Sequence, residues 1–194
     1  MNYILFQDEY KNNLAPFTIN HASFEVRCGA YTNIERIMHL MDVNDKLYLI
    51  VEPDFCSIIR EKYPDSIVNP EVIPEGLCLN GATLWDPDII EKMDYNHNYS
   101  SNGILISMYL DEEIAFLEFH QKLKLSVQVT LDIPVIHFSY LWDAIFAQND
   151  VLNKDADEFI ANRGGDIHQS VIYDKIETVF VHETAKISAG VILD

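Results

Sequence analysis

Several residues of the chain could bind a charged ligand. Asp8 follows a short apolar run, and its carboxylate could either ligate Mg²⁺ or cap the following loop. Arg27 could bind a phosphate, or it could pair with a neighbouring carboxylate such as Glu25. Asn80 and Gly81 could contact a base or a sugar, or they could form an ordinary tight turn. The chemistry suggested is that of phosphate and metal binding, with a structural alternative at each position.

The histidines and cysteines have mainly structural interpretations. His137 lies within a predicted strand and is interpreted as a hydrogen-bonded core residue rather than a base. His182 lies in a repeat near the C-terminus and is assigned no catalytic role. Cys28, Cys56 and Cys78 are widely spaced beside apolar residues, so we expect buried thiols rather than metal ligands or a redox pair.

The composition is that of an acidic globular protein. The chain has 194 residues, 48% of them hydrophobic, which suffices for one sizeable core. Its 31 acidic and 13 basic residues give a net charge of −18, which repels nucleic acid and anionic membranes, so neither is expected as a partner. No run approaches the roughly 18 apolar residues of a membrane span, and no signal peptide is recognisable, so we expect a cytoplasmic location. A polyanionic ligand would need Mg²⁺ or a local cluster of Arg and Lys to reverse the field.

The apolar pattern predicts alternating strands and helices. Strands are expected at residues 3–6, 46–51, 67–68, 77–79, 103–109 and 135–138. Helices are expected at residues 32–41, 55–63, 86–92, 111–120, 142–149 and 155–162. Thr32 and Glu35 fit a capping box, and residues 94–102 are predicted to be a solvated loop. This order predicts an α/β fold with a mostly parallel, Rossmann-like sheet and helices on both faces.

A six-residue repeat begins near the C-terminus. Residues 181–186 and 187–192 superpose, and residues 193–194 begin a third unit. Aliphatic first positions and small or aliphatic fifth positions are the inward positions of a hexapeptide β-helix. We therefore predict an α/β domain over residues 1–165, then a linker and the first, truncated repeats of a left-handed β-helix over residues 166–194.

Short motifs along most of the chain carry a family resemblance. They are NYILF at residues 2–6, NLAPFT at 13–18, EVRCG at 25–29, LNG at 79–81, YLWD at 140–143 with Asn149, and the hexapeptide start. With these motifs the chain resembles bifunctional sugar-1-phosphate nucleotidyltransferases that carry a C-terminal hexapeptide acyltransferase domain. In particular it is similar to a diverged branch, GlcNAc-1-phosphate uridylyltransferase-like or glucose-1-phosphate thymidylyltransferase-like.

The resemblance implies a reaction and a set of site residues. A sugar-1-phosphate oxygen would attack the α-phosphorus of a nucleoside triphosphate and release pyrophosphate, with Mg²⁺ as cofactor and mainly electrostatic help from the protein. Lys11 and Arg27 would face phosphates, and Asn80 with Gly81 would face the base or sugar. The site predicted in this way has Arg27 as catalytic residue, Asp8 as metal ligand, and Lys11, Thr18, Asn80 and Gly81 as substrate-binding residues.

The sequence also departs from the family pattern. The loop at residues 8–13 contains no glycine and two carboxylates, and no lysine follows Thr18 before Lys46, although Arg27 is placed to supply the missing cation. Ala82 stands where the resemblance implies a metal-binding Asp. These departures keep two alternatives open beside the leading hypothesis of nucleotidyl transfer. One is a catalytically silent scaffold that orients or regulates a β-helix acyltransferase, and the other is an acceptor-binding domain of such an acyltransferase. A complete hexapeptide helix would imply a homotrimer in this family.

Overall fold

The computed structural model describes residues 1–126, 130–156, 164–176 and 179–193. The chain divides into two compact units, Met1–Gln148 (unit 1) and Asn149–Asp194 (unit 2). The domain boundary between residues 165 and 166 stays a prediction.

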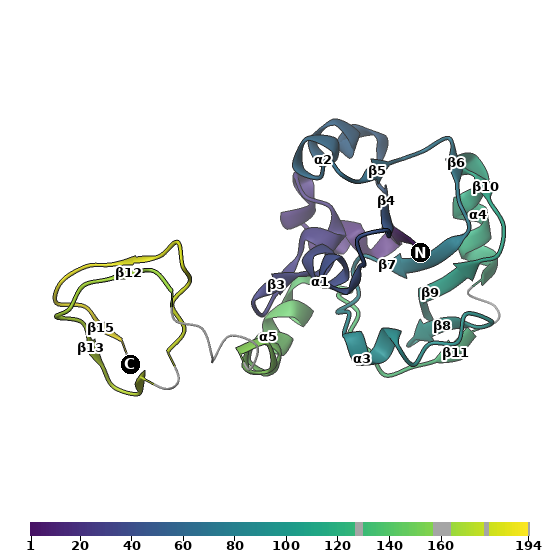
Figure 1. Cartoon of the computed structure of the whole chain (residues 1–194). Helices are drawn as coiled ribbons and strands as arrows, with labels where there is room; N and C mark the ends of the chain where they lie inside the picture. Colours follow the sequence, from purple (N-terminus) through teal and green to yellow (C-terminus); the bar gives the residue numbers. More distant parts are fainter. Residues whose placement is uncertain (127–129, 157–163, 177–178, 194) are drawn as a thin grey trace. The chain divides into compact units, whose positions relative to one another are not determined.

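Unit 1 contains a seven-stranded sheet in the order β11-β8-β9-β7-β1-β4-β5 among the described residues (Figure 1). Its strands are β1 (Asn2–Phe6), β4 (Lys46–Ile50), β5 (Ile67–Val68), β7 (Gly76–Asn80), β8 (Asn98–Ser101), β9 (Ile104–Leu110) and β11 (Thr130–Asp132). Pairing is parallel between β1 and its neighbours β4 and β7, between β4 and β5, and between β8 and β11. Strand β9 runs antiparallel to β7 and β8. The predicted mostly parallel α/β sheet is confirmed, with one antiparallel strand inserted.

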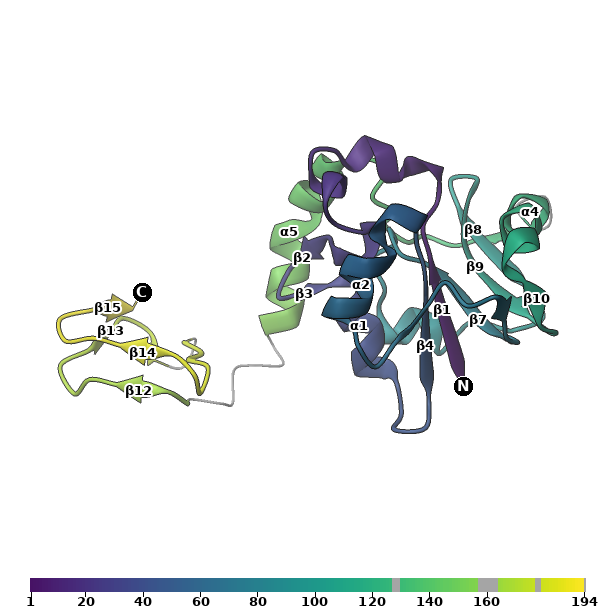
Figure 2. The same cartoon turned by 90° about the horizontal axis from the view of Figure 1, so that it is seen from above.

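Helices cover both faces of this sheet, as Figure 2 shows from above. The helices are α1 (Asn33–Leu40), α2 (Cys56–Lys62), α3 (Pro87–Ile90), α4 (Phe116–Ser126) and α5 (Leu141–Ala156). Because side chains alternate along a strand, β1 supplies both cores. Tyr3 and Leu5 join the cluster that includes Ile34 of α1, whereas Ile4 and Phe6 join the cluster that includes Phe119 of α4. Both faces of β1 are therefore buried, as its continuous apolar run requires.

Short elements connect the main strands. They are the 3₁₀ helices η1 (Glu9–Leu14), η2 (Phe17–Ile19), η3 (Ser23–Glu25) and η4 (Pro53–Phe55), and the strands β2 (Arg27–Cys28), β3 (Tyr31–Thr32), β6 (Val72–Ile73) and β10 (Ile114–Ala115). Strand β2 pairs with β3, and β6 pairs with β10. The predicted capping box is confirmed, because the Thr32 side chain accepts from Glu35 N and the Glu35 side chain accepts from Thr32 N.

Three element predictions are wrong in part. Residues 98–101 form β8 rather than loop, because Tyr99 packs into the core and the small serines beside it are buried without an apolar signature. Helix α4 begins at Phe116 rather than residue 111, since Ile114–Ala115 pairs with β6. Residues 135–138 make a single bridge, Thr83 to His137, instead of a strand.

The last helix region also differs from the prediction. The helices predicted at residues 142–149 and 155–162 are not separate, because the single helix α5 runs from Leu141 to Ala156. Asp155, predicted to cap the second helix, lies inside α5. Residues 157–162 of the second predicted helix lie outside the described residues.

Unit 2 consists of short parallel strand pairs after α5. They are β12 (Asp166–Ile167) with β14 (Lys186–Ile187), and β13 (Ile172–Tyr173) with β15 (Ile192–Leu193). Asp166 pairs with Lys186 and Ile172 pairs with Ile192, so both pairs have the same offset along the sequence. The predicted inward positions are less exposed than their neighbours: Val181, Ala185, Ile187, Val191 and Leu193. A complete left-handed β-helix remains a prediction.

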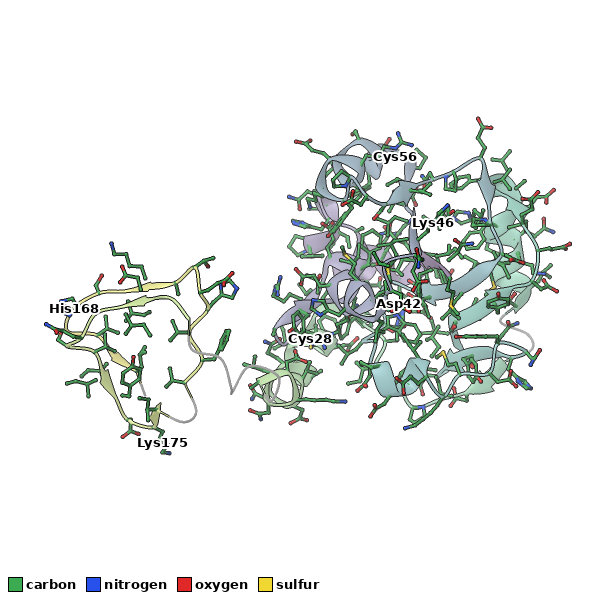
Figure 3. The ribbon with its side chains drawn as sticks, in the orientation of Figure 1. Cys28, Asp42, Lys46, Cys56, His168 and Lys175 are labelled. Carbon is green, nitrogen blue, oxygen red and sulfur yellow. The ribbon has the colours of Figure 1, made fainter. Side chains whose placement is uncertain are left out.

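The three cysteines are free thiols. Cys28 and Cys56 lie apart in unit 1 (Figure 3), and the three cysteines form no disulfide. Cys28 and Cys78 are buried as expected, whereas Cys56 is partly exposed, and burial raises the pKa of the Cys78 thiol. In the part of the chain that is described, no helix is long and apolar enough to cross a membrane.

Candidate active site

Asp8 stands at the carboxyl end of β1, where the chain leaves the sheet and enters η1. Its Oδ1 accepts a hydrogen bond from Tyr10 N at 2.9 Å, which caps the first turn of η1. Its Oδ2 accepts one from Asn80 Nδ2 at 2.7 Å and lies 2.7 Å from His137 Nε2. The capping role suggested as an alternative to metal binding is therefore present, and two distant segments converge on the same carboxylate.

These contacts set the charge of Asp8. Burial, which by itself raises the pKa of a carboxyl, is outweighed by the hydrogen bond and charge of His137, with further hydrogen bonds from Asn80 and Tyr10 N. The pKa of Asp8 is therefore lower than the ordinary value, and Asp8 is a carboxylate at neutral pH. Only 14% of its side chain is exposed.

Asn80 holds Asp8 from within the core. Its side chain has no exposed surface, and besides Asp8 its Nδ2 donates to Leu105 O at 2.9 Å. Its Oδ1 accepts from Ala82 N at 2.9 Å, and its backbone oxygen accepts from Trp85 Nε1 at 3.0 Å. Both amide protons are used within the protein, so Asn80 links β7 and β9 to the carboxylate.

His137 is equally enclosed. Its side chain is 4% exposed, with Ser139 Oγ 3.0 Å from Nδ1 and Asp8 Oδ2 at Nε2. The same local contact between a histidine and the hydroxyl two positions later occurs at His168 with Ser170 and at His182 with Thr184. The His137–Ser139 contact therefore reflects local turn geometry rather than an activated serine, which agrees with the interpretation of His137 as a hydrogen-bonded core residue.

A cavity of about 360 Å³ opens beside Asp8 at the carboxyl edge of β1. Its wall is formed by the end of β1 and η1, by Glu52 after β4, by the start of β9, and by α4. The lining residues are Phe6, Gln7, Asp8, Glu9, Tyr10, Lys11, Glu52, Gly103, Ile104, Leu105, His120, Leu123 and Lys124. The carboxyl edge of a parallel sheet is where open α/β folds bind their ligands.

Three basic side chains meet at this cavity in a chain of net charge −18. Lys11 comes from η1, and its Nζ forms an ion pair with Glu52. Burial lowers the pKa of Lys11, and the charge of Asp8 opposes that effect. Burial also lowers the pKa of His120, and the positive charges of Lys11 and Lys124 lower it further. Three carboxylates, those of Asp8, Glu9 and Glu52, line the same cavity, so its basic side chains offset acidic ones within the wall.

Arg27 is placed elsewhere. Its guanidinium binds Ala30 O and the Glu35 carboxylate, with 3.1 Å between Nη2 and Oε2, and 54% of the side chain is exposed. The carboxylate partner is therefore Glu35, while Glu25 pairs with Lys62 at 2.8 Å. Strand β2, which carries Arg27, lies on the α1 side of the sheet, opposite α4 (Figures 1 and 2). Arg27 is not part of the cavity wall.

Thr18 and Gly81 also lie outside the wall of this cavity. Thr18 Oγ1 donates to Lys11 O at 2.8 Å, so it supports the turn that presents Lys11. Gly81 is buried against Phe24, and a Cβ at this position would stand 2.9 Å from Phe24 Cβ. Its carbonyl accepts from Asn33 Nδ2 at 2.9 Å. Of the six predicted site residues, the cavity gathers Asp8 and Lys11, and Asn80 adjoins them through Asp8.

The same part of the chain matches a known family. The sequence matches the family described as sugar nucleotidyl transferase over residues 3–164. The chain belongs to this family. Sugar nucleotidyl transferases act on nucleoside triphosphates and sugar phosphates, so the family supports nucleotidyl transfer as the general chemistry. A search of curated proteins finds no match to the chain.

Sugar nucleotidyl transferases typically use Mg²⁺, which oxygen ligands such as the carboxylates near the cavity would have to bind. Asp8 already accepts hydrogen bonds on both oxygens, and Ala82 contributes no ligand. Glu52 is engaged by Lys11. Within the described ranges, no group of three or more His, Cys, Asp or Glu side chains could hold a metal. The residues present do not form a Mg²⁺ site of their own.

His120 and Lys124 were missed from the sequence, although a signal exists. From residue 119 to residue 131 the chain contains no acidic residue, in a protein with 31 of them, and two lysines and a histidine fall in this stretch. The predicted helix ends at His120, whereas α4 continues to Ser126, so Lys124 falls outside the predicted helix.

Proposed function

We propose that this sugar nucleotidyl transferase transfers a nucleotidyl group from a nucleoside triphosphate to a sugar-1-phosphate in the cavity between η1 and α4. The observation that carries the proposal is the convergence of three basic side chains at the carboxyl edge of β1 in an otherwise acidic chain. A triphosphate bound there would replace Glu52 as the partner of Lys11.

The reaction places modest demands on the protein. An oxygen of the sugar-1-phosphate forms a bond to the α-phosphorus, and the bond from the α-phosphorus to the bridging oxygen breaks, releasing pyrophosphate. The attacking oxygen is already anionic, so no general base is required, and the protein contributes mainly positioning and electrostatic stabilisation. In this proposal Lys11 neutralises phosphate charge, Asp8 fixes the start of η1, and Asn80 fixes Asp8.

This assignment moves phosphate binding away from Arg27. Arg27 as catalytic residue remains a competing proposal, as does a substrate contact by Thr18 or Gly81. Both side chains pair with a carboxylate, Lys11 with Glu52 and Arg27 with Glu35. The geometry favours Lys11, because it lines the cavity and Arg27 does not.

A turnover assay tests the proposal. Pyrophosphate release is measured with UTP, dTTP, CTP, GTP and ATP, each with glucose-1-phosphate or GlcNAc-1-phosphate, with and without Mg²⁺. We expect release that requires both substrates, falls at least about tenfold in Lys11→Gln, and changes less than twofold in Arg27→Gln. Release that is abolished in Arg27→Gln but retained in Lys11→Gln would restore the original assignment. Absence of release with every pair would favour the silent scaffold.

We also propose that unit 2 begins a hexapeptide β-helix of the bifunctional acyltransferase type. The parallel pairing of Asp166 with Lys186 and of Ile172 with Ile192 supports it, because consecutive turns of a β-helix stack in this way. Sedimentation equilibrium of a protein with a complete hexapeptide helix tests the associated homotrimer: a trimeric mass supports it, and a monomer at all concentrations contradicts it.

A further inference from the structure

We propose that Lys11, His120 and Lys124 form a phosphate cradle that binds the pyrophosphoryl end of the nucleotide through protein cations rather than through a glycine-rich loop. This inference rests on the proposed function and specifies which end of the substrate occupies the cavity. It assigns a binding role to α4, a helix to which neither the motifs nor the family match assigns one.

The fold fixes the direction of the two α4 side chains. His120 and Lys124 are four residues apart, so they occupy the same face of the helix. Phe119 anchors this part of α4, because it is fully buried and its ring packs edge-on against Phe6 of β1, with centroids 6.3 Å apart. The cradle is therefore tied to the strand that also positions Lys11 through η1.

Another lysine on α4 faces a different surface. Lys122 lines a separate depression together with Tyr109, Asp111 and other residues at the amino-terminal end of β8 and the end of β9. Lys122 therefore carries the same charge as Lys124 and lies on the same helix, but it does not line the cavity. This makes Lys122 a matched control.

The charges around the cavity suit a phosphate ligand better than a bare metal ion. Asp8 accepts hydrogen bonds on both oxygens, and Glu52, 49% exposed, can turn to solvent when a ligand takes Lys11. A bound phosphate would then meet two ammonium groups and one imidazole, with Asp8 and Glu9 as the remaining carboxylates of the wall. The loop at residues 8–13 needs no glycines in this arrangement, because side-chain cations replace backbone amides as the phosphate ligands.

The cradle also predicts a pH dependence. The groups lining the cavity with His120 are Lys11, Asp8, Glu9 and Tyr10 from the β1–η1 segment, Glu52 after β4, and Lys124 on α4. In the free protein, burial and the two lysines lower the pKa of His120, so its imidazole is neutral near pH 7. A bound phosphate dianion favours the protonated ring, so binding takes up a proton and tightens as pH falls from about 8 to about 6.

Calorimetric titration with inorganic pyrophosphate in EDTA tests the cradle on the whole chain. We expect saturable binding that weakens about tenfold or more in Lys124→Gln and in Lys11→Gln, with less than a twofold change in Lys122→Gln. Pyrophosphate itself titrates in this range, and this contributes a pH dependence to binding by any variant. Wild type should show an additional pH dependence from His120, and the His120→Gln variant should lack that additional part. Equal binding by Lys124→Gln and Lys122→Gln, or no binding by wild type, would overturn the inference.

Pyrophosphate binding by the cradle and turnover by the proposed transferase can succeed or fail independently. Turnover on a nucleotide and a sugar-1-phosphate, combined with pyrophosphate binding that ignores Lys124, leaves the function standing and removes the cradle. Pyrophosphate binding that depends on Lys124, without turnover on any substrate pair, supports the cradle and removes the function. If both hold, Lys124→Gln should raise KM for the nucleotide while KM for the sugar-1-phosphate stays within twofold.

Discussion

At the scale of single residues, the site is organised around the carboxylate of Asp8, which is mostly buried and hydrogen-bonded within the protein. Asp8 is reached by a backbone amide, an asparagine and a histidine from three segments of the chain. Such a group stabilises the fold as well as the site, since hydrogen bonds to a charged group are each worth about 1.5–3 kcal/mol.

Replacing Asp8 by Asn should lower the free energy of unfolding by about 2 kcal/mol at pH 7. The folded-state pKa of Asp8 lies below its unfolded value, so its contribution is fully present above the unfolded pKa of about 3.9 and is lost as pH falls through the folded pKa. Urea titrations at pH 7, 5, 4 and 3 should show the difference between wild type and Asp8→Asn constant down to about pH 5 and shrinking below about 4. The exposed Asp65→Asn is the control, and a difference at pH 3 as large as that at pH 7 would contradict this assignment.

Replacing Asn80 by Ala should cost about 3 kcal/mol of stability, because it leaves Leu105 O and Ala82 N without their buried partner and removes a donor to Asp8. Chemical denaturation measures the change, with the exposed Asn44→Ala as control. A loss below about 1 kcal/mol would mean that Asn80 does not hold the two strands and the carboxylate together.

Residue types alone indicated part of this site. Asp8 and Lys11 follow directly after a recognisable strand, so the sequence places them at the sheet edge. The hydrogen bonds of Asn80 were not predictable, because its partners Asp8 and Leu105 lie 72 and 25 residues away in sequence. Arg27 is the first Lys or Arg after Thr18, yet its pairing with Glu35 depends on the β2–β3 hairpin and the α1 cap.

At the scale of elements, local periodicity predicted those that bury an unbroken apolar stripe. Helix α1, with its capping box, and strands β1, β4 and β7 are confirmed nearly to the residue. Strand β8 was missed, because its buried serines carry no hydrophobic signal and its pairing with β9 and β11 is non-local. The start of α4 was misplaced for the same reason, since Ile114–Ala115 is fixed by its pairing with β6.

Close approach of β1 and β7 requires a glycine at position 76. Gly76 has φ of +157°, and a Cβ there would lie 2.4 Å from Asn2 O of the neighbouring strand. Gly76→Ala should therefore destabilise the protein by about 3 kcal/mol or more. Gly103 also has positive φ, +79°, but open space around it, so Gly103→Ala should cost about 1 kcal/mol. Equal losses of Tm for the two variants would show that the contact between β1 and β7 is not tight.

At the scale of the whole molecule, unit 1 extends into the first half of α5. Cys28 Sγ contacts Ala144 O at 3.4 Å, Gly29 N donates to Gln148 Oε1 at 3.0 Å, and Ala144 and Ala147 are buried. These contacts join the helix to the β2–β3 hairpin. The sequence showed the helix but not what it packs against.

A fragment of residues 1–148 should therefore unfold cooperatively, whereas a fragment of residues 1–140 should be less stable by about 3 kcal/mol. Thermal and urea denaturation followed by circular dichroism measure the difference. Equal stability of the two fragments would mean that α5 does not contribute to unit 1.

Hydrogen–deuterium exchange with bound nucleotide reports where the substrate lies, and so distinguishes the cavity beside α4 from the surface around Arg27. UTP, dTTP and ATP are each added to the whole chain, and amide protection is followed in η1, in α4 and in the β2–β3 hairpin. The account predicts protection by at least one nucleotide in residues 9–14 and 116–126, reduced in Lys124→Gln, with residues 27–35 unchanged. Protection confined to residues 27–35 would contradict it and place the phosphates at Arg27 instead.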